Sequence, residues 1–239
     1  MFFTKKCRIC GFQADFSLDE GQNFSEFLFS DKKRRYFRCP KCRSVTVEEK
    51  YFLGKNEQKS RYELHNNTLK DSGYKNYLES FFYSTVDAVK KNLENEFFEG
   101  ECDFSTWNYL DYGSGPEPCL AELVRQKLLF HSVEIYDPFF APKLLDEQNF
   151  ELITCLEVAE HFENPLEDFA LISKLLKPSG FLSLQTNLLT EKIDFEKWWY
   201  KEDLTHVAFY TEEGLEKCAI KSGLKLVFRK KNLVLLRKL

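Results

Sequence analysis

The stretch Tyr109-Leu-Asp-Tyr-Gly-Ser-Gly-Pro-Glu-Pro118 decides the fold. Residues 107–112 are mostly aromatic or apolar, which predicts a buried strand, and the two glycines after it predict a sharp turn whose backbone lies close to a ligand. Pro116 and Pro118 suit the first turn of a helix, because a proline there loses no needed N–H. A strand, a glycine turn and a helix in this order present free amides to a bound group.

Acidic residues end two neighbouring predicted strands. Asp111 lies at the end of the first strand, and Val133-Glu-Ile-Tyr-Asp137 is a second short strand that ends in Asp137. In α/β folds that bind nucleotides, a carboxylate about twenty residues after the glycine turn contacts the ribose. A tight turn without any ligand produces the same glycine pattern, so this pattern alone leaves the function open.

Composition limits the class of protein. The chain of 239 residues is 43% hydrophobic, which is ample for a core, and its length suits one large domain or a domain with a small module. Its apolar runs are far too short to span a membrane. The start, Met1-Phe-Phe-Thr-Lys-Lys-Cys7, brings charge and cysteine at once, unlike a signal peptide. We therefore expect a reducing, cytoplasmic setting, where clustered cysteines indicate metal rather than disulfides.

Two C-x2-C pairs, Cys7-Arg-Ile-Cys10 and Cys39-Pro-Lys-Cys42, lie near the N-terminus. Each pair can form a tight knuckle, so that four sulfurs meet one tetrahedral Zn²⁺. Such a site has no open position, and we predict a structural zinc ribbon over residues 1–50. The unpaired cysteines are expected in the core; they are Cys102, Cys119, Cys155 and Cys218.

Charge is unevenly distributed around a net value of −4. Residues 1–50 carry 11 Lys and Arg against 7 Asp and Glu, whereas residues 51–239 carry 23 against 31. This weak basic surplus does not by itself indicate nucleic-acid binding. The run Asp31-Lys-Lys-Arg-Arg-Tyr-Phe-Arg38 is either a strand that contacts phosphates and bases or a solvated hairpin arm. We favour the arm, because charge runs usually form solvated surface.

Residues 51–99 are interpreted as a linker and a helical lid. Apolar residues recur at helical spacing from Ser60 to about Asn95, and Ser72-Gly73 is expected to separate two helices. The polar group between Arg61 and Tyr74 either covers the ligand crevice or forms a helix surface with its cap, and the sequence leaves both interpretations open.

Residues 100–239 are interpreted as one α/β domain. The chain after Asp137 is too short for a complete βαβ unit, so one strand or helix is reduced there. Strands and helices then alternate before a closing antiparallel hairpin. We expect strands at 151–156 and 181–186, helices at 166–176 and 212–222, and hairpin strands at 224–228 and 233–236.

The ordered motifs resemble those of class I S-adenosylmethionine-dependent methyltransferases, over essentially the whole chain. They are Leu110-Asp-Tyr-Gly-Ser-Gly115, Tyr136-Asp137, Thr154-Cys-Leu-Glu-Val-Ala-Glu-His161 and Leu176-Lys-Pro-Ser-Gly-Phe-Leu182. The segments 62–74, 136–140 and 199–210 are similar to those of a bacterial branch with an N-terminal zinc ribbon. The resemblance implies a Rossmann-like α/β sheet with an antiparallel C-terminal hairpin, and S-adenosylmethionine as cofactor.

The resemblance also implies which residues bind the cofactor. The backbone of Gly113, Ser114 and Gly115 would follow the methionine and ribose, and Asp111 would lie near the amino end. Asp137, with Pro138 beside it, would accept both ribose hydroxyls. Two further residues would border the sulfonium, and they are Leu156 and Glu157.

One position departs from the family pattern. Glu117 stands where the turn usually has its last glycine. We expect its side chain to point outward, because a carboxylate is favourable at a helix N-terminus. A nicotinamide-binding fold is the rival interpretation, but its fingerprint requires a third glycine where this chain has Pro118.

Candidate catalytic residues lie in two loops. His161 follows a predicted strand end, and the aromatic segment 198–210 contains Asp203, His206 and Tyr210. A hydroxyl, amine or carbon nucleophile can need a base, and we expect His206 to act as base or substrate ligand, oriented by Asp203. The competing interpretation is a packed histidine and an aromatic loop that covers the sheet.

Three acceptor classes remain. A small molecule, sugar-like or another metabolite, comes first, because an acidic domain with an aromatic loop suits a closed pocket. RNA comes second, and in that case the ribbon would recognise the RNA. Protein comes third. A non-catalytic domain that binds S-adenosylmethionine, or a scaffold, is the alternative to an enzyme.

Overall fold

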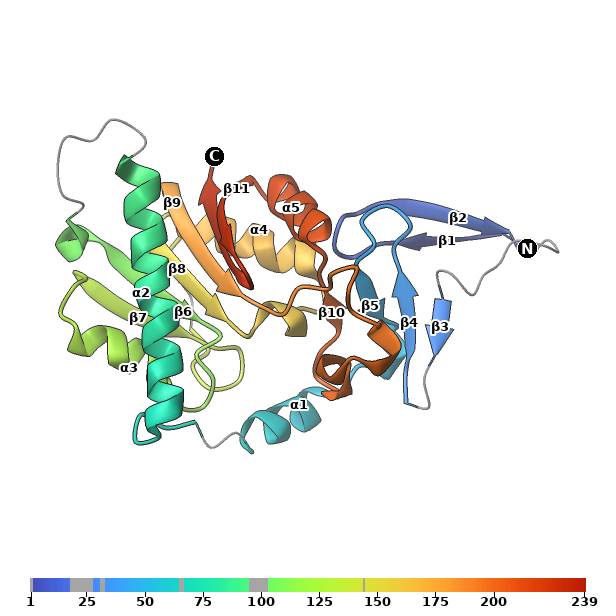
Figure 1. Cartoon of the computed structure of the whole chain (residues 1–239), viewed down its shortest axis with the longest axis horizontal. Helices are drawn as coiled ribbons and strands as arrows, with labels where there is room; N and C mark the ends of the chain where they lie inside the picture. Colours follow the sequence, from blue (N-terminus) through green and yellow to red (C-terminus); the bar gives the residue numbers. More distant parts are fainter. Residues whose placement is uncertain (1, 18–27, 31–32, 65–66, 95–102, 144) are drawn as a thin grey trace.

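A six-stranded sheet forms the centre of the computed structural model, which describes residues 2–17, 28–30, 33–64, 67–94, 103–143 and 145–239 (Figure 1). Across the sheet the strands are β11 (Leu224–Lys230), β12 (Leu233–Lys238), β9 (Leu176–Gln185), β8 (Phe150–Leu156), β6 (Asn108–Tyr112) and β7 (Ser132–Tyr136). The pairs β9–β8, β8–β6 and β6–β7 are parallel, whereas β12 is antiparallel to both β9 and β11. This confirms the predicted Rossmann-like sheet with its antiparallel hairpin.

Helices cover both faces of this sheet. One face packs against α2 (Ser72–Glu94) and α3 (Cys119–Gln126), and the other against α4 (Pro165–Leu175) and α5 (Glu212–Lys221). Successive side chains of β12 alternate between the two layers: Leu235 joins the cluster with α2, and Leu236 the cluster with α4 and α5. Burial on both faces explains why β8 and the first four residues of β12 are mostly apolar.

The connection from β7 to β8 is shortened, as predicted. Residues 137–143 and 145–149 contain neither a helix nor a strand, and an isolated bridge joins Asp137 to Ala141. Within the described residues, β7 is therefore followed by a loop where a complete unit would have a helix.

Two helices precede the sheet. They are α1 (Lys55–Tyr62) and α2, but the break between them lies earlier than expected, because α2 already begins at Ser72. The side chain of Asp71 accepts the amide of Tyr74 at 3.0 Å, which caps the first turn of α2. Gly73 thus lies inside the helix. None of the helices described combines the length and apolarity needed to cross a membrane.

The N-terminal part consists of small antiparallel sheets. One is the hairpin of β1 (Phe2–Lys6) and β2 (Gln13–Ser17). The other contains β3 (Leu28–Ser30), β4 (Arg35–Arg38) and β5 (Val45–Val47), and its edge is β10 (Ala208–Phe209) from the C-terminal part (Figure 1). Residue pairs Ala208–Thr46 and Phe209–Val45 form this junction. A strand from beyond residue 200 therefore completes a sheet of the ribbon.

Candidate functional site

A cavity of about 780 Å³ opens at the carboxyl ends of β6, β7 and β8. Ligands of open α/β sheets bind at this edge, and the volume is within the range of about 300–1,000 Å³ that is usual for ligand pockets. The predicted cofactor residues all line it: Asp111, Gly113, Ser114, Gly115, Asp137, Pro138, Leu156 and Glu157. Among the predicted catalytic residues, His161, Asp203 and His206 line the same cavity.

The turn after β6 requires both of its glycines. Gly113 has a φ of 81°, and a Cβ on it would lie 2.5 Å from a methyl carbon of Val158. Gly115 has a φ of 68°, and nothing lies within 4 Å of its Cβ position, so its backbone borders open space. The hydroxyl oxygen of Ser114 is buried and has no hydrogen-bond partner within the described part of the chain. The turn thus offers a close backbone approach and a free polar atom to a ligand.

Asp137 ties this turn to the end of β7. One carboxylate oxygen accepts the amide of Gly115 at 2.9 Å, and the other accepts the amides of Phe139 and Phe140 at 2.8 and 3.1 Å. An ionised carboxylate has about four acceptor positions, so one remains for a hydroxyl donor. The side chain is only 6% exposed and its orientation is fixed before any ligand binds.

Asp111 lies deeper, at the end of β6. Burial raises the pKa of its carboxyl to about 7, although hydrogen bonds from the Ala121 backbone and the Thr154 side chain oppose the shift. A cation that enters the cavity would favour the charged form of this carboxyl.

Glu157 has a left-handed backbone conformation with a φ of 52°. Its amide donates to the carbonyl of Gln185 at 2.9 Å, and its carboxylate accepts the hydroxyls of Tyr77 and Tyr200, each at 3.3 Å. Burial and the neighbouring Glu160 raise the pKa of this carboxyl to about 7. A strained residue with two tyrosine partners at the mouth of a cavity is typical of functional sites.

Glu160 and His161 lie in the 3₁₀ turn η4 (Ala159–His161) that follows β8. Glu160 is completely buried, and its Oε2 accepts the hydroxyl of Thr186 at 2.8 Å. Nδ1 of His161 lies 3.1 Å from the carbonyl of Thr205 and must carry the proton, because a carbonyl only accepts. Burial lowers the pKa of His161, so its ring is neutral near pH 7.

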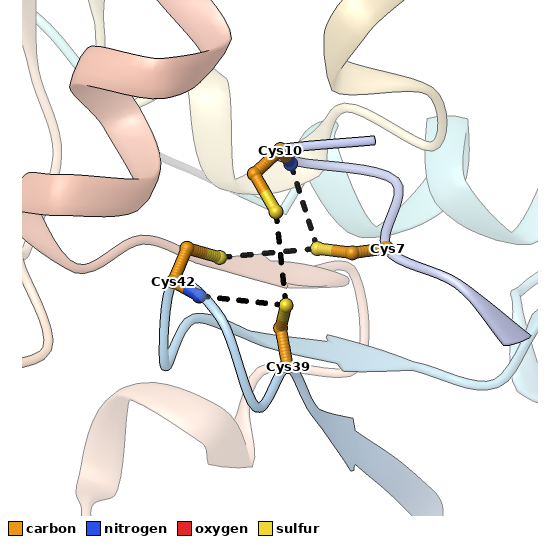
Figure 2. Close-up of side chains that lie close together, drawn as sticks. All are labelled: Cys7, Cys10, Cys39 and Cys42. Carbon is orange, nitrogen blue, oxygen red and sulfur yellow. Dashed lines mark hydrogen bonds between the residues drawn. The ribbon is translucent and has the colours of Figure 1, made fainter. Parts of the chain in front are cut away.

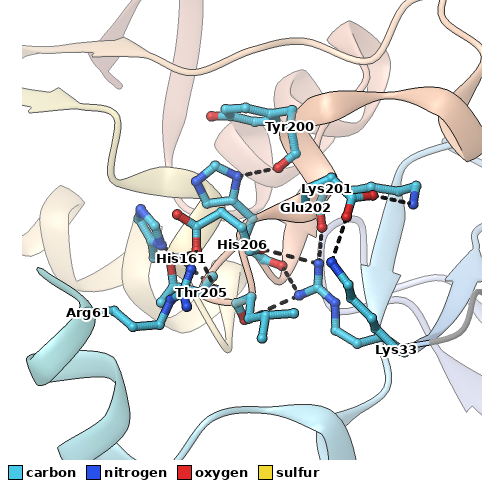
Figure 3. A network of polar contacts seen from close by, with 11 residues as sticks. Lys33, Arg61, His161, Tyr200, Lys201, Glu202, Thr205 and His206 are labelled. Carbon is cyan, nitrogen blue, oxygen red and sulfur yellow. Dashed lines mark hydrogen bonds and ion pairs between the residues drawn. The ribbon is translucent and has the colours of Figure 1, made fainter. Parts of the chain in front are cut away.

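His206 comes from the loop between β9 and β10 (residues 186–207), called the β9–β10 loop below. Its Nδ1 lies 2.7 Å from the carbonyl of Tyr200, and its ring centroid lies 4.2 Å from the ring of Tyr200 and 4.8 Å from that of His161. Figure 3 shows the two imidazole rings beside one another. Burial and His161 lower the pKa of His206 to about 3, which makes it a weak base but a free lone-pair donor.

Asp203 shapes the β9–β10 loop instead of orienting His206. Its Oδ1 accepts the amide and the hydroxyl of Thr205 at 2.9 and 2.7 Å, and Arg61 of α1 approaches it at 3.4 Å (Figure 3). Burial opposes ionisation, but these bonds from Thr205 prevail and lower the pKa of Asp203 to about 2. The ring of His206 takes its orientation from Tyr200.

Tyr210 does not reach the cavity. The residue follows β10 with 0% of its surface exposed, and its hydroxyl donates to the carbonyl of Ala159 at 2.8 Å. Its ring packs edge-on against Phe169 of α4. The prediction that Tyr210 lines the substrate site is therefore wrong. Tyr210 belongs to the hydrophobic core, and its hydrogen bond to Ala159 holds the turn that carries Glu160 and His161.

The four cysteines of the two C-x2-C pairs converge in the N-terminal part (Figure 2). Sγ of Cys7 lies 3.9 Å from that of Cys42, and Sγ of Cys10 lies 3.7 Å from that of Cys39. Four sulfurs that are each about 2.3 Å from a tetrahedral Zn²⁺ are about 3.8 Å apart. All four side chains are buried. The donor set and its spacing therefore fit zinc.

The two knuckles share their backbone geometry. The amide of Gly11 donates to the carbonyl of Cys7 at 2.8 Å, and that of Arg43 donates to the carbonyl of Cys39 at 2.9 Å. Both residues have positive φ, 68° for Gly11 and 61° for Arg43. The second knuckle therefore places a non-glycine residue in the left-handed conformation that the first gives to glycine.

Helix α5 docks on the second knuckle. Its N-cap residue Thr211 donates from the hydroxyl to the carbonyl of Cys42 at 2.5 Å, and its amide donates to the hydroxyl of Ser44 at 3.0 Å. Gly214 permits this approach, because a Cβ there would lie 1.9 Å from Oγ of Ser44. The cysteine cluster and the sheet also share one hydrophobic core.

Two buried polar positions at the site are not predicted from the sequence. Glu160 belongs to a motif that was recognised, and its signal was an acid directly before His161. Arg34 lies in the basic run for which the sequence predicts a solvated arm or a strand that contacts phosphates. In the structure Arg34 is only 3% exposed and donates hydrogen bonds to carbonyls of the β9–β10 loop. No local pattern separates it from Arg35, which is exposed. Predictions for Asp31, Lys32, His65, Asn66 and Cys102 concern positions outside the described residues.

Comparison with known proteins agrees with this geometry. A family profile for methyltransferase domains matches residues 66–228, which is more than half of the chain. The chain therefore belongs to this methyltransferase family and is an S-adenosylmethionine-dependent methyltransferase. A comparison with curated protein sequences gives no significant match.

Solved structures of methyltransferases are similar in part. A protein from Leishmania major is 12% identical, with 76% of this chain and 81% of that chain covered and a TM-score of 0.49. One from Methanosarcina mazei is 12% identical over 62% of this chain and 97% of its own, with a TM-score of 0.43. One from Mesorhizobium loti is 13% identical over 57% and 93%, with a TM-score of 0.42.

Proposed function

We propose that the protein transfers the methyl group of S-adenosylmethionine to a small-molecule acceptor, sugar-like or another metabolite. One observation carries the proposal: a single cavity gathers the glycine turn and two strand-end acids on one side, and two neutral histidines on the other. Transfer by in-line displacement needs a donor pocket and an acceptor pocket that meet in this way.

The residues of the donor side fit the cofactor. The turn Gly113–Gly115 would follow the methionine and ribose, with the free hydroxyl of Ser114 as a further donor. Asp137 would accept one ribose hydroxyl through its remaining acceptor position, and Asp111 would face the amino end. Leu156 and Glu157 would border the reactive centre. Glu117 is exposed but also lines the cavity beside the turn, so its carboxylate would have to point away from the carboxylate of the cofactor. When bound, the cofactor supplies a methyl group activated by its positive sulfur.

The acceptor side would be enclosed by aromatic and polar side chains. Tyr62 of α1 contacts the ring of His161 edge-on with centroids 5.3 Å apart, and Tyr77 of α2 bonds to Glu157. The β9–β10 loop adds Tyr200 and His206. A pocket with these walls would hold a small acceptor and exclude water from the reacting atoms, which supports a metabolite over a polymer.

The basic run of the ribbon gives RNA less support. Lys33 pairs with Glu202 at 2.7 Å and Arg35 with Glu48 at 3.6 Å, which partly neutralises the charges that would meet phosphates. We therefore rank RNA second and protein third.

We further propose a structural Zn²⁺ on Cys7, Cys10, Cys39 and Cys42, and a division into a ribbon (1–50), a linker with a helical lid (51–99) and a catalytic domain (100–239). Reduced thiols at this cluster would suit a cytoplasmic setting. Elemental analysis of the purified protein should find about one zinc per chain, and a cluster with no metal would contradict the site.

Calorimetry with S-adenosylhomocysteine tests the donor side. We expect one molecule to bind per chain, and the absence of binding would contradict the proposed function. RNA is tested by nucleic acid that co-purifies and by a salt-dependent mobility shift. A protein with either property would move RNA ahead of the small molecule.

A further inference from the structure

Three potential metal ligands meet on the acceptor side of the cavity. One carboxylate oxygen of Glu160 and one ring nitrogen each of His161 and His206 lie within 4.8 Å of one another. They come from two segments: η4 supplies the first two, and the β9–β10 loop supplies His206. Ligands about 2.1 Å from one cation are about 3.0–3.4 Å apart, so small side-chain movements would bring all three onto one ion.

Both histidines have the same ring nitrogen, Nε2, available to bind a metal ion. In each ring, Nδ1 is bonded to a backbone carbonyl, that of Thr205 for His161 and that of Tyr200 for His206. A carbonyl accepts only, so both Nδ1 atoms carry protons and both Nε2 atoms have a lone pair. Metal-bound histidines commonly donate their other ring N–H to a carbonyl in this way, which fixes the tautomer and the orientation of the ring.

Glu160 is an independent sign of a missing partner. Its side chain has 0% of its surface exposed, and Oε2 is bonded to Thr186. Its other oxygen, Oε1, is buried and has no well-formed hydrogen bond within the described residues, although the Tyr200 hydroxyl and the Glu157 carboxyl interact with the same carboxyl group. A buried carboxylate oxygen without a partner is unfavourable and needs an explanation, which a bound cation would give.

We propose that Glu160, His161 and His206 bind one divalent transition-metal ion that holds the acceptor of the methyl group, an inference that rests on the proposed function. Two imidazole nitrogens with one carboxylate suit Fe²⁺, Mn²⁺, Co²⁺ or Zn²⁺, and they leave coordination positions open. These positions face the cavity, because all three ligands line it. Because more than one coordination position is open, the acceptor class that fits is a molecule that chelates the ion through a hydroxyl group and a neighbouring second oxygen.

The ion would solve a problem that the protein residues leave open. A hydroxyl must lose its proton when it accepts a methyl group, but the ring nitrogens free to take that proton, Nε2 of His161 and Nε2 of His206, are the proposed ligands of the ion. On the ion the acceptor O–H would ionise more easily and release its proton to water. The oxygen lone pair then forms the bond to the methyl carbon, and the carbon–sulfur bond breaks with its electron pair on sulfur. The products are a methyl ether, a neutral thioether and a hydrated proton.

Binding of Mn²⁺, followed by electron paramagnetic resonance, tests the site in the full-length protein. Mn²⁺ is the probe because thiolates bind it poorly, so it leaves a zinc-loaded cysteine cluster unchanged. We expect one Mn²⁺ per chain, with affinity at least ~10-fold lower in Glu160→Gln, His161→Gln and His206→Gln. His131→Gln is the matched control, since His131 is exposed and lies outside the cavity. The control should bind as the unchanged protein does.

Binding of S-adenosylhomocysteine to each variant separates the possible failures. A variant that binds it normally but has lost Mn²⁺ supports the site. If the unchanged protein binds S-adenosylhomocysteine but no Mn²⁺, or if all three variants keep Mn²⁺, the metal site is wrong while the proposed function stands. If the unchanged protein does not bind S-adenosylhomocysteine, the proposed function is wrong, and the metal site that rests on it is wrong as well. His161→Gln, the substitution at the least buried ligand, decides the result if the other two variants do not fold.

Discussion

The guanidinium of Arg34, from the ribbon, donates to the main-chain carbonyl of His206 at 2.8 Å. It also donates to the carbonyls of Leu204 and Asp203, each at 3.2 Å, and to that of Lys201. One buried cation from the N-terminal part therefore holds the backbone of the loop that carries His206 into the cavity. The N-terminal part in this way supports a loop that lines the cavity, although neither Arg34 nor the four clustered cysteines line it themselves.

Arg34→Lys should loosen the β9–β10 loop. A lysine has one ammonium group and cannot reach several carbonyls at once, and each lost charged hydrogen bond contributes about 1.5–3 kcal/mol. We expect faster hydrogen exchange in residues 199–207 and normal binding of S-adenosylhomocysteine. Lys33→Ala is the control, because Lys33 forms an exposed ion pair that contributes about 0–1 kcal/mol. Equal exchange in both variants would mean that Arg34 does not hold the loop.

Asp137→Ala and His206→Ala should separate cofactor binding from turnover. Without the carboxylate of Asp137 the ribose loses its acceptor, and the amides of Gly115 and Phe139 lose their partner. We expect at least ~10-fold weaker binding of S-adenosylhomocysteine in Asp137→Ala, equivalent to about 1.4 kcal/mol or more. His206→Ala should bind S-adenosylhomocysteine with an affinity within about twofold of that of the unchanged protein, but its rate of methyl transfer should be much lower. Calorimetry that finds the same loss in both variants would refute this division of roles.

Asp111→Asn should change the pH dependence of stability. The pKa of Asp111 is raised to about 7 in the folded protein, so the unfolded chain loses this proton first as the pH rises. Stability therefore falls between about pH 4 and pH 7, and the full penalty, a few kcal/mol at most, is present above pH 7. Asparagine removes this penalty. Urea unfolding should find the variant stabilised relative to the unchanged protein at pH 8 but not at pH 4, and the same difference at both pH values would contradict the assignment.

Gly214→Ala should separate α5 from the ribbon. In an isolated helix this change is stabilising by about 1 kcal/mol. Here the new Cβ would lie 1.9 Å from Oγ of Ser44, so we expect a net loss of stability of about 1–3 kcal/mol. Ser44→Ala removes the clashing oxygen and should restore part of the loss in the double variant. A double-mutant cycle with no coupling between the two positions would mean that α5 is not docked as described.

The sheet and the donor side of the cavity were predictable because they depend on local patterns. Buried strands that end in an acid or a glycine turn also end at one edge of a parallel sheet, so Asp111, Gly113 and Asp137 had to meet. The shortened segment after Asp137 followed from the number of residues available. The closing hairpin followed from two apolar runs with a polar turn between them.

The acceptor side was less predictable because its contacts join distant parts of the chain. The pairing of β10 with β5 involves two residues of β10, Ala208 and Phe209, and such a short strand has no periodicity to recognise. Burial of Arg34 depends on carbonyls about 170 residues further along the chain. Tyr210 stands in an aromatic segment like its neighbours, and only the fold shows that its hydroxyl points into the core.

The two-residue strand β10 also has a consequence for any dissection of the chain. A fragment that begins after residue 50 would lack β5, so the backbone groups of Ala208 and Phe209 that pair with Thr46 and Val45 would lose their partners, and unpaired strands of this kind promote aggregation. Residues 51–239 alone are therefore not expected to fold stably. A shortened version of the protein should keep residues 33–47, because this segment pairs with β10 and bonds to the β9–β10 loop through Arg34.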